Sequence, residues 1–128
     1  MKLFTKSVVL AASLGMATVA MAADPIVGNY QTYENGQPKA TVKITQSGST
    51  FTGKIIAGNT AKAKQYIGRT VIKGLKAKGG GKYSGGKITD PVSGKTYRLS
   101  ATKSGNTLKL RGYMGVEALG RTQTWKKK

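Results

Sequence analysis

Turn-forming residues interrupt this chain seven times between residues 35 and 120, and this spacing limits the folds open to it. The interruptions are rich in glycine, and most place asparagine, serine, aspartate or proline beside it, the residue types that accept the backbone angles of tight turns. They fall at Asn35-Gly36, Ser47-Gly48, 58–64, Gly79-Gly80-Gly81, 90–94, Ser104-Gly105-Asn106 and 115–120. Seven breaks predict eight short strands.

Between the breaks, apolar and polar residues alternate with the two-residue period of a half-buried strand. Ala40, Val42 and Ile44 are expected on one face, with lysine and threonine on the other. The same alternation recurs in 51–57, 97–101 and 108–112. The lysines fall mostly on the outward face, where they are solvated and discourage pairing of strand edges between molecules.

We expect an all-β fold in which eight antiparallel strands form an up-and-down barrel. A two-layer sandwich also accommodates eight strands, but consecutive hairpins make a meander, and closing the meander removes its exposed edges. Glycines inside predicted strands, at 53, 68, 86 and 112, suit the bends and bulges of a small barrel. The segment 58–65 is expected to form one helical turn at most. An eight-stranded barrel is either filled by side chains or holds one small ligand.

The first 22 residues have the pattern of a secretory signal peptide. Lys2 and Lys6 precede an uncharged apolar run over 8–22, which ends in Ala20-Met21-Ala22. A basic start, a short apolar run and an A-x-A site are the three parts of such a peptide, and the run is too short to span a membrane. We therefore expect cleavage after Ala22, a single domain over 23–128, and a periplasmic or secreted location.

The mature chain is very basic. The whole chain has a formal charge of +18, and without the two lysines of 1–22 the charge of 23–128 is +16. Such a charge favours anionic partners, and outside the cytosol these include anionic membrane surfaces and acidic small molecules, whereas export argues against nucleic acid. A lysine-rich, solvated surface without a partner explains the same charge. The chain has no cysteine, so no disulfide supports the fold.

Six segments of the mature chain together form a recognisable series. They are 24–30 (DPIVGNY), 68–75 (GRTVIKGL), 85–91 (GGKITDP), 94–97 (GKTY), 108–113 (LKLRGY) and 120–125 (GRTQTW). The series resembles the domain-of-unknown-function 2147 family (DUF2147) of small exported bacterial proteins. The resemblance implies a lipocalin-like, or calycin-like, barrel and export, and it implies no activity. The chain departs from the family at Tyr30, where tryptophan is usual, in the lysine-bearing segment 59–65, which replaces an acidic loop, and in lacking the cysteines of many members.

The lipocalin resemblance also implies a device that closes one end of the barrel. Lipocalins place a Gly-x-Trp on the first strand and stack a basic side chain from the last strand over it. Gly28 and Tyr30 are the counterparts of that motif here, and Arg121 is the candidate for the basic side chain, stacked on the Tyr30 ring.

Catalysis has little support in the sequence, and we expect no enzyme. The chain has no histidine, so the usual general base and the usual metal ligand are missing. Glu34, Asp90 and Glu117 fall in three different predicted turn regions, which argues against a carboxylate pair. The run Gly79-Gly80-Gly81-Lys82 does not lead into a helix, so it predicts a hairpin turn and no phosphate loop. We therefore expect no cofactor and no metal.

Binding is the remaining function class. The candidate ligand-binding residues are Tyr97, Arg111, Tyr113, Arg121 and Trp125. Arg121 lies on the same strand face as Trp125, so an inward Trp125 brings a guanidinium with it, and a buried cation requires a partner. We expect a small amphipathic or anionic molecule in the barrel, although the aromatic side chains also suit simple filling of it. The alternative is a basic scaffold that docks on anionic lipid or lipopolysaccharide and has no cavity ligand.

Overall fold

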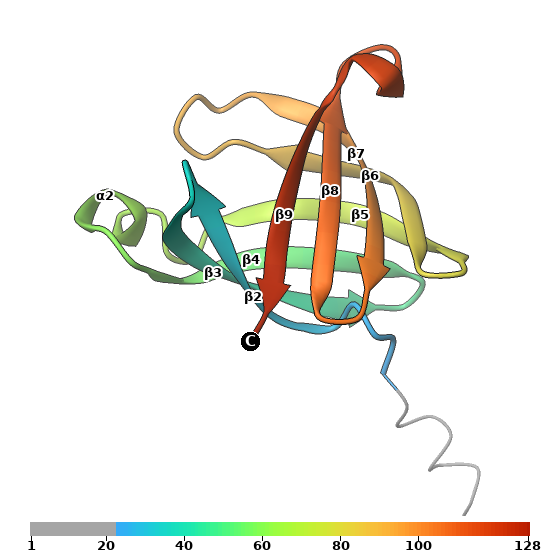
Figure 1. Ribbon diagram of the computed structural model, residues 1–128, viewed down its shortest axis with the longest axis horizontal. Helices are drawn as coiled ribbons and strands as arrows, with labels where there is room; N and C mark the ends of the chain where they lie inside the picture. The colour runs from blue at the N-terminus through green and yellow to red at the C-terminus, as the bar shows by residue number, and fades with distance from the viewer. Residues whose placement is uncertain (1–22) are drawn as a thin grey trace, which may run out of the picture.

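The computed structural model describes residues 23–128, which form a closed barrel of eight antiparallel strands (Figure 1). The strands are β2 (Gly28–Glu34), β3 (Gln37–Ser47), β4 (Thr50–Gly58), β5 (Thr70–Gly79), β6 (Lys82–Thr89), β7 (Thr96–Ser104), β8 (Thr107–Tyr113) and β9 (Arg121–Lys127). Each strand pairs with its neighbours in sequence, and β2 pairs with β9 to close the barrel. The predicted up-and-down barrel is confirmed. The predicted signal peptide lies outside the described residues.

Two short helices interrupt the strands. Helix α2 (Ala61–Lys64) lies between β4 and β5, and the 3-10 helix η1 (Glu117–Leu119) lies between β8 and β9. Thr60 caps α2, because its hydroxyl accepts a hydrogen bond from the Ala63 amide at 3.0 Å. The single helical turn predicted for 58–65 is therefore confirmed. Within 23–128, no helix is long and apolar enough to cross a bilayer.

The inward face of the barrel carries the predicted apolar residues, with one exception. Ala40, Val42 and Ile44 are buried on β3, as the alternation predicted. Ala57 was expected inward but is exposed, because a β-bulge at Ile56 shifts the phase of β4 after Ile55. A one-residue shift turns every following side chain to the other face.

The glycine at 86 permits a close approach of two strands. A Cβ atom at Gly86 would lie 2.8 Å from the Cα atom of Leu75 on β5, closer than carbon atoms approach without strain. The register between β6 and β7 shifts between Tyr83 and Gly86. The strand bends sharply at this point, as expected for a small barrel.

The two ends of the barrel differ. We call the end with the turns 48–49, 80–81 and 105–106 the closed end, and the end with the loops 35–36, 59–69, 90–95 and 114–120 the open end. Residues 23–27 cross the closed end, where Ile26 and Tyr30 are fully buried. Phe51 and Tyr83 pack beside them edge to face, with ring centroids 5.6 Å apart.

Residues 23–27 and the buried side chains of Tyr30 and Tyr83 form a plug in the closed end, and hydrogen bonds hold it together. The Tyr30 hydroxyl donates to the Ile26 carbonyl at 2.8 Å, and the Ile26 amide donates to the Asp24 carboxylate at 3.0 Å. The Tyr83 hydroxyl donates to the same carboxylate. Burial, and next the hydrogen bond to Asp24, raise the pKa of Tyr83 above its ordinary value. The polar ends of both buried tyrosines are therefore satisfied inside the plug.

The basic side chain that covers the closed end is Lys127, and the prediction that Arg121 stacks on Tyr30 is wrong. Lys127 pairs with Tyr30 across the β2–β9 seam, and its ammonium donates to the Pro25 carbonyl at 3.0 Å. Its stem lies over Gly28, where a Cβ atom would meet the Lys127 Cε at 2.7 Å. Arg121 lies six residues earlier on β9, about 20 Å away along an extended strand.

The Tyr30→Phe variant tests how the plug depends on pH. Burial, and secondarily the nearby Asp24, raise the pKa of Tyr30 from 10.0 to about 12. The folded protein therefore keeps this proton where the unfolded chain has lost it, so the resulting stability is complete below pH 10 and is lost as the pH rises to about 12. Over that range we expect the free energy of unfolding of the wild type to fall by about 2–3 kcal/mol more than that of Tyr30→Phe, measured by urea denaturation.

Tyr33→Phe is the control for this experiment, because it removes a phenol that is exposed at the open end. Its pH dependence is expected to follow that of the wild type. Identical pH dependence of the wild type and Tyr30→Phe would show that the buried phenol does not hold its proton in this way.

Candidate functional site

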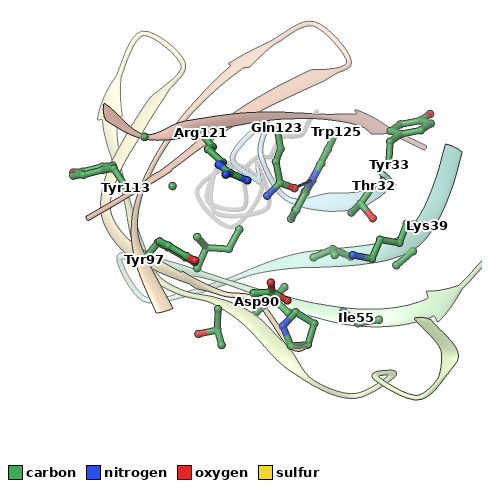
Figure 2. A pocket seen from close by; sticks show the side chains of 18 of the residues that line it. Thr32, Tyr33, Lys39, Ile55, Asp90, Tyr97, Tyr113, Arg121, Gln123 and Trp125 are labelled. Atoms are coloured by element: carbon green, nitrogen blue, oxygen red, sulfur yellow. Dashed lines mark hydrogen bonds between the residues drawn. The ribbon is translucent and has the colours of Figure 1, made fainter. Parts of the chain in front are cut away.

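A cavity of about 560 Å³ occupies the open half of the barrel (Figure 2). Its floor is apolar and includes Val42, Ile55, Val71 and Trp125, none of which is more than 6% exposed. Ala40 also faces the floor, and its small side chain leaves space that a larger residue would fill. Larger side chains, among them Tyr30, Phe51 and Tyr83, fill the interior of the closed half, so this cavity lies in the open half. A second hollow, of about 410 Å³, lies at the closed end between residues 24–25 and the β5–β6 turn.

Strand β9 brings three different functional groups into the cavity. Figure 2 shows Arg121, Gln123 and Trp125 side by side, because alternate residues of a strand point to the same face. The Trp125 ring nitrogen donates to the Gln123 side-chain carbonyl at 3.2 Å. Trp125 is 3% exposed, whereas Gln123 and Arg121 are exposed, so polarity increases from the floor to the opening.

The rim of the cavity carries polar and aromatic side chains from several strands. Tyr97 reaches it from β7, whereas Tyr113 borders it at the end of β8 with its ring pointing away from the cavity in Figure 2, and both are half-buried. Thr32 lines the cavity from β2 and is buried. The hydroxyls of Tyr97 and Thr32 thus lie around an apolar floor, the arrangement typical of small-molecule sites.

The charges at the rim are unequal. Lys39 and Arg121 are the basic lining residues, and Asp90 is the acidic one. The Lys39 ammonium lies 3.2 Å from the Glu34 carboxylate, and the Asp90 carboxylate accepts a hydrogen bond from the Val92 amide within its own turn. Across 23–128, no carboxylate lies within ion-pair distance of Arg121. The guanidinium at the opening is therefore available to an anion.

Four of the five predicted ligand-binding residues line the cavity, and Arg111 does not. Tyr97, Tyr113, Arg121 and Trp125 are brought together around one space. Arg111 lies on the outward face of β8, so its guanidinium binds the β8–β9 loop. It donates to the Glu117 carbonyl at 2.8 Å, the Ala118 carbonyl at 2.9 Å and the Thr122 hydroxyl at 2.6 Å.

The sequence prediction omitted several lining residues. Lys39 was placed on the outward face of its strand, yet it reaches the rim near the start of β3, beside a register shift in β2 between Thr32 and Tyr33. Leu119 and Met114 come from the β8–β9 loop. Loop residues show no alternation of apolar and polar residues, so the sequence could not predict that Leu119 and Met114 line the cavity. Their position follows from the path of the loop over the rim.

Residues 23–128 offer few side chains for metal binding or acid–base catalysis. Among 23–128, no three Asp, Glu, His or Cys side chains gather into a group that could hold a metal ion. Glu117 lies outside the cavity, where its carboxylate accepts a hydrogen bond from Ser100. Asp90 therefore has no second carboxylate beside it in the cavity lining.

A comparison with family models connects this barrel to a bacterial family. Residues 28–127 match the model described as an uncharacterized protein conserved in bacteria (DUF2147). The chain belongs to the DUF2147 family. The match covers all eight strands, from the first residue of β2 to the last of β9. The family predicted from the six sequence segments is therefore confirmed. The comparison with curated proteins yields no match.

A solved structure shows the same fold. It is that of protein HP1028 from the human pathogen Helicobacter pylori, which belongs to the lipocalin family. The two chains are 23% identical, the similarity covers 83% of this chain and 84% of that one, and the TM-score is 0.67. At this identity the likeness establishes a lipocalin-like barrel. Such a barrel is a fold suited to binding small molecules.

Replacing Arg111 tests its role in fixing the open end. Arg111→Ala removes two hydrogen bonds to the β8–β9 loop and one to Thr122 on β9, each of which contributes about 1 kcal/mol. We expect the amides of Leu119 and Gly120, which donate within η1, to exchange with solvent several times faster, measured by hydrogen–deuterium exchange. Arg98→Ala, an exposed arginine on the outer wall of β7, should leave both rates unchanged. Equal exchange rates in Arg111→Ala and the wild type would show that the loop keeps its conformation without the Arg111 side chain.

Proposed function

We propose that this protein is an exported, non-enzymatic carrier that binds one small amphipathic anion in the open half of its barrel. The observation that supports the proposal most directly is the position of Arg121, a guanidinium without a carboxylate partner within 23–128, above an apolar floor. A molecule with an anionic head and an apolar tail complements both features at once.

The size and lining of the cavity support binding of the tail. A volume of about 560 Å³ lies within the roughly 300–1,000 Å³ typical of ligand pockets. An apolar chain buried on the floor gains roughly 0.8 kcal/mol per CH₂ group removed from water. A chain of about ten CH₂ groups therefore gains roughly 8 kcal/mol, which must also offset the entropy lost on binding, so the headgroup contact adds to the affinity.

The headgroup is expected at Arg121 and Gln123. A guanidinium binds a carboxylate or phosphate through two parallel hydrogen bonds, and the Gln123 amide offers further donors beside it. Lys39 adds positive charge across the opening, although Glu34 offsets part of it. The polar rim thus selects for an anion, while the floor discriminates little among apolar chains.

The alternative of a basic scaffold without a cavity ligand has less support. Exposed lysine or arginine side chains occur on seven of the eight strands, so the positive charge surrounds the wall instead of forming one face. This distribution suits a solvated, self-repelling surface. A scaffold also gives no reason for the hollow in the open half. The expected export also argues against nucleic acid as a partner, because it places the protein outside the cytosol.

Arg121→Gln tests the headgroup contact, and the single tryptophan reports it. Trp125 is the only tryptophan of the chain and lies on the cavity floor, so energy transfer to cis-parinaric acid detects occupancy directly. In the wild type we expect dodecanoate to displace the probe at roughly tenfold lower concentration than dodecan-1-ol, because a charge-assisted hydrogen bond contributes about 1.5–3 kcal/mol. In Arg121→Gln the two competitors should become nearly equal.

Arg98→Gln is the matched control, since it removes the same charge from the outer wall. It should retain the preference for dodecanoate. Absence of energy transfer at saturating probe would overturn the carrier proposal, and a wild type that prefers the alcohol would overturn the role of Arg121.

Export has its own test. When the full chain is expressed in a Gram-negative bacterium, we expect the protein in the periplasmic fraction with Ala23 as its first residue, because 1–22 has the parts of a signal peptide. The measurement is the intact mass of the purified protein. A cytosolic protein with the mass of all 128 residues would contradict the proposal.

A further inference from the structure

The exposed apolar side chains are concentrated at one end of the barrel. Seven large apolar residues of 23–128 are exposed, and all of them lie on the loops or strand ends of the open end. They are Tyr33, Ile56, Ile67, Val92, Met114, Val116 and Leu119. The turns of the closed end, at 48–49, 80–81 and 105–106, contain no such residue. Exposed apolar groups gathered on one side of a protein indicate an interaction surface.

These side chains form separate tips around the opening. Val92 lies on the β6–β7 loop, Ile67 follows α2, Val116 precedes η1 and Leu119 is the last residue of η1; these loops are separate in Figure 1. Leu119 is 82% exposed and Val116 57% exposed, although Arg111 holds their loop against β8. Tips on separate loops suit a deformable partner better than a rigid one, because a rigid surface must match the height of each tip.

Lysine and arginine side chains lie beside these exposed apolar residues, and the nearby carboxylates are paired or hydrogen-bonded. Lys62, Lys64 and Arg69 are exposed beside Ile67, and Lys95 is exposed on the same loop as Val92. The carboxylate of Glu34 binds Lys39. That of Asp90 accepts from the Val92 amide, and that of Glu117 accepts from Ser100. These three carboxylates keep their negative charge, but the lysine and arginine side chains at the open end outnumber them, so the net charge around the opening is positive.

We propose that the open end docks on a bilayer rich in anionic lipid, so that the cavity opens directly onto the membrane. Apolar tips with lysine and arginine beside them are the features of an interfacial membrane contact. Docking itself is independent of the cavity ligand. Only its consequence, exchange of an amphipathic anion between bilayer and cavity, rests on the function proposed above.

The closed end is the competing surface for an anionic membrane. It carries Lys78 and Lys82 near one turn and Lys126, Lys127 and Lys128 at the chain end. Its attraction is purely electrostatic, since no large apolar side chain is exposed there among the described residues. The two surfaces are therefore distinguished by whether binding depends on apolar residues and by which lysines matter.

Co-sedimentation with vesicles tests the proposal. The probes are vesicles of phosphatidylcholine alone and of phosphatidylcholine with phosphatidylglycerol, at low and physiological salt. We expect binding only to the mixed vesicles, and roughly tenfold weaker binding by the double variant Val92→Ser/Val116→Ser. Neither valine lines the cavity, so displacement of cis-parinaric acid should be unchanged in this variant. That second measurement also shows that the variant is folded.

Two lysine pairs locate the contact. Lys62→Gln/Lys64→Gln at the open end should weaken binding about tenfold, and Lys78→Gln/Lys82→Gln at the closed end should have little effect. Equal losses from both pairs, with no effect of the valine variant, would show a general electrostatic coat and overturn the proposal. Absence of binding to either vesicle would overturn docking. Arg121→Gln removes one charge from the opening and is expected to weaken vesicle binding less than the open-end lysine pair does, whereas it removes the preference for dodecanoate, so failure of the carrier function and failure of docking are separate outcomes.

Discussion

The seam between β2 and β9 closes the barrel, and the rest of the structure depends on it. Two residue pairs form it, Tyr30 with Lys127 and Gln31 with Lys126, and the Lys128 amide donates to the Asn29 carbonyl beside them at 2.9 Å. The same residues also seal the closed end, because Tyr30 fills the interior and Lys127 lies over Gly28 to reach the Pro25 carbonyl. The chain has no disulfide, and one set of contacts both joins its first and last strands and fills the closed end of the barrel. Without the seam, β2 and β9 would be open sheet edges.

Closure leaves an interior that is filled at one end only. Tyr30, Phe51 and Tyr83 pack the closed half with aromatic rings. In the open half, Ala40 and Gly112 face the hollow, and the apolar floor around Trp125 stays accessible from the rim. Where the large side chains fall therefore decides whether this fold is a solid barrel or a container. The charged and aromatic groups at the opening then set which molecules suit it.

Much of the fold follows from local rules, while the site follows from them only in part. Turn residues at Asn35-Gly36 and at 90–94, together with alternation in 40–44, predicted eight strands and their inward faces, because turn geometry and burial act over a few residues. Trp125 and Arg121 were paired correctly, since residues four apart on a strand share a face. Ala57 was misplaced because a bulge changes the phase of a strand, and bulges come from the pairing of distant segments.

The sequence by itself determined the strand count, the meander, the basic surface and the membership of the DUF2147 family, since each of these depends on local patterns or on matching segments. Tertiary structure decided which end of the barrel each side chain occupies. Arg121 and Lys127 lie on one strand, and nothing in their spacing shows which of them covers Tyr30, because this depends on the register of β9 against β2. The same register places Arg121 at the open end, beside a cavity that no single strand contains.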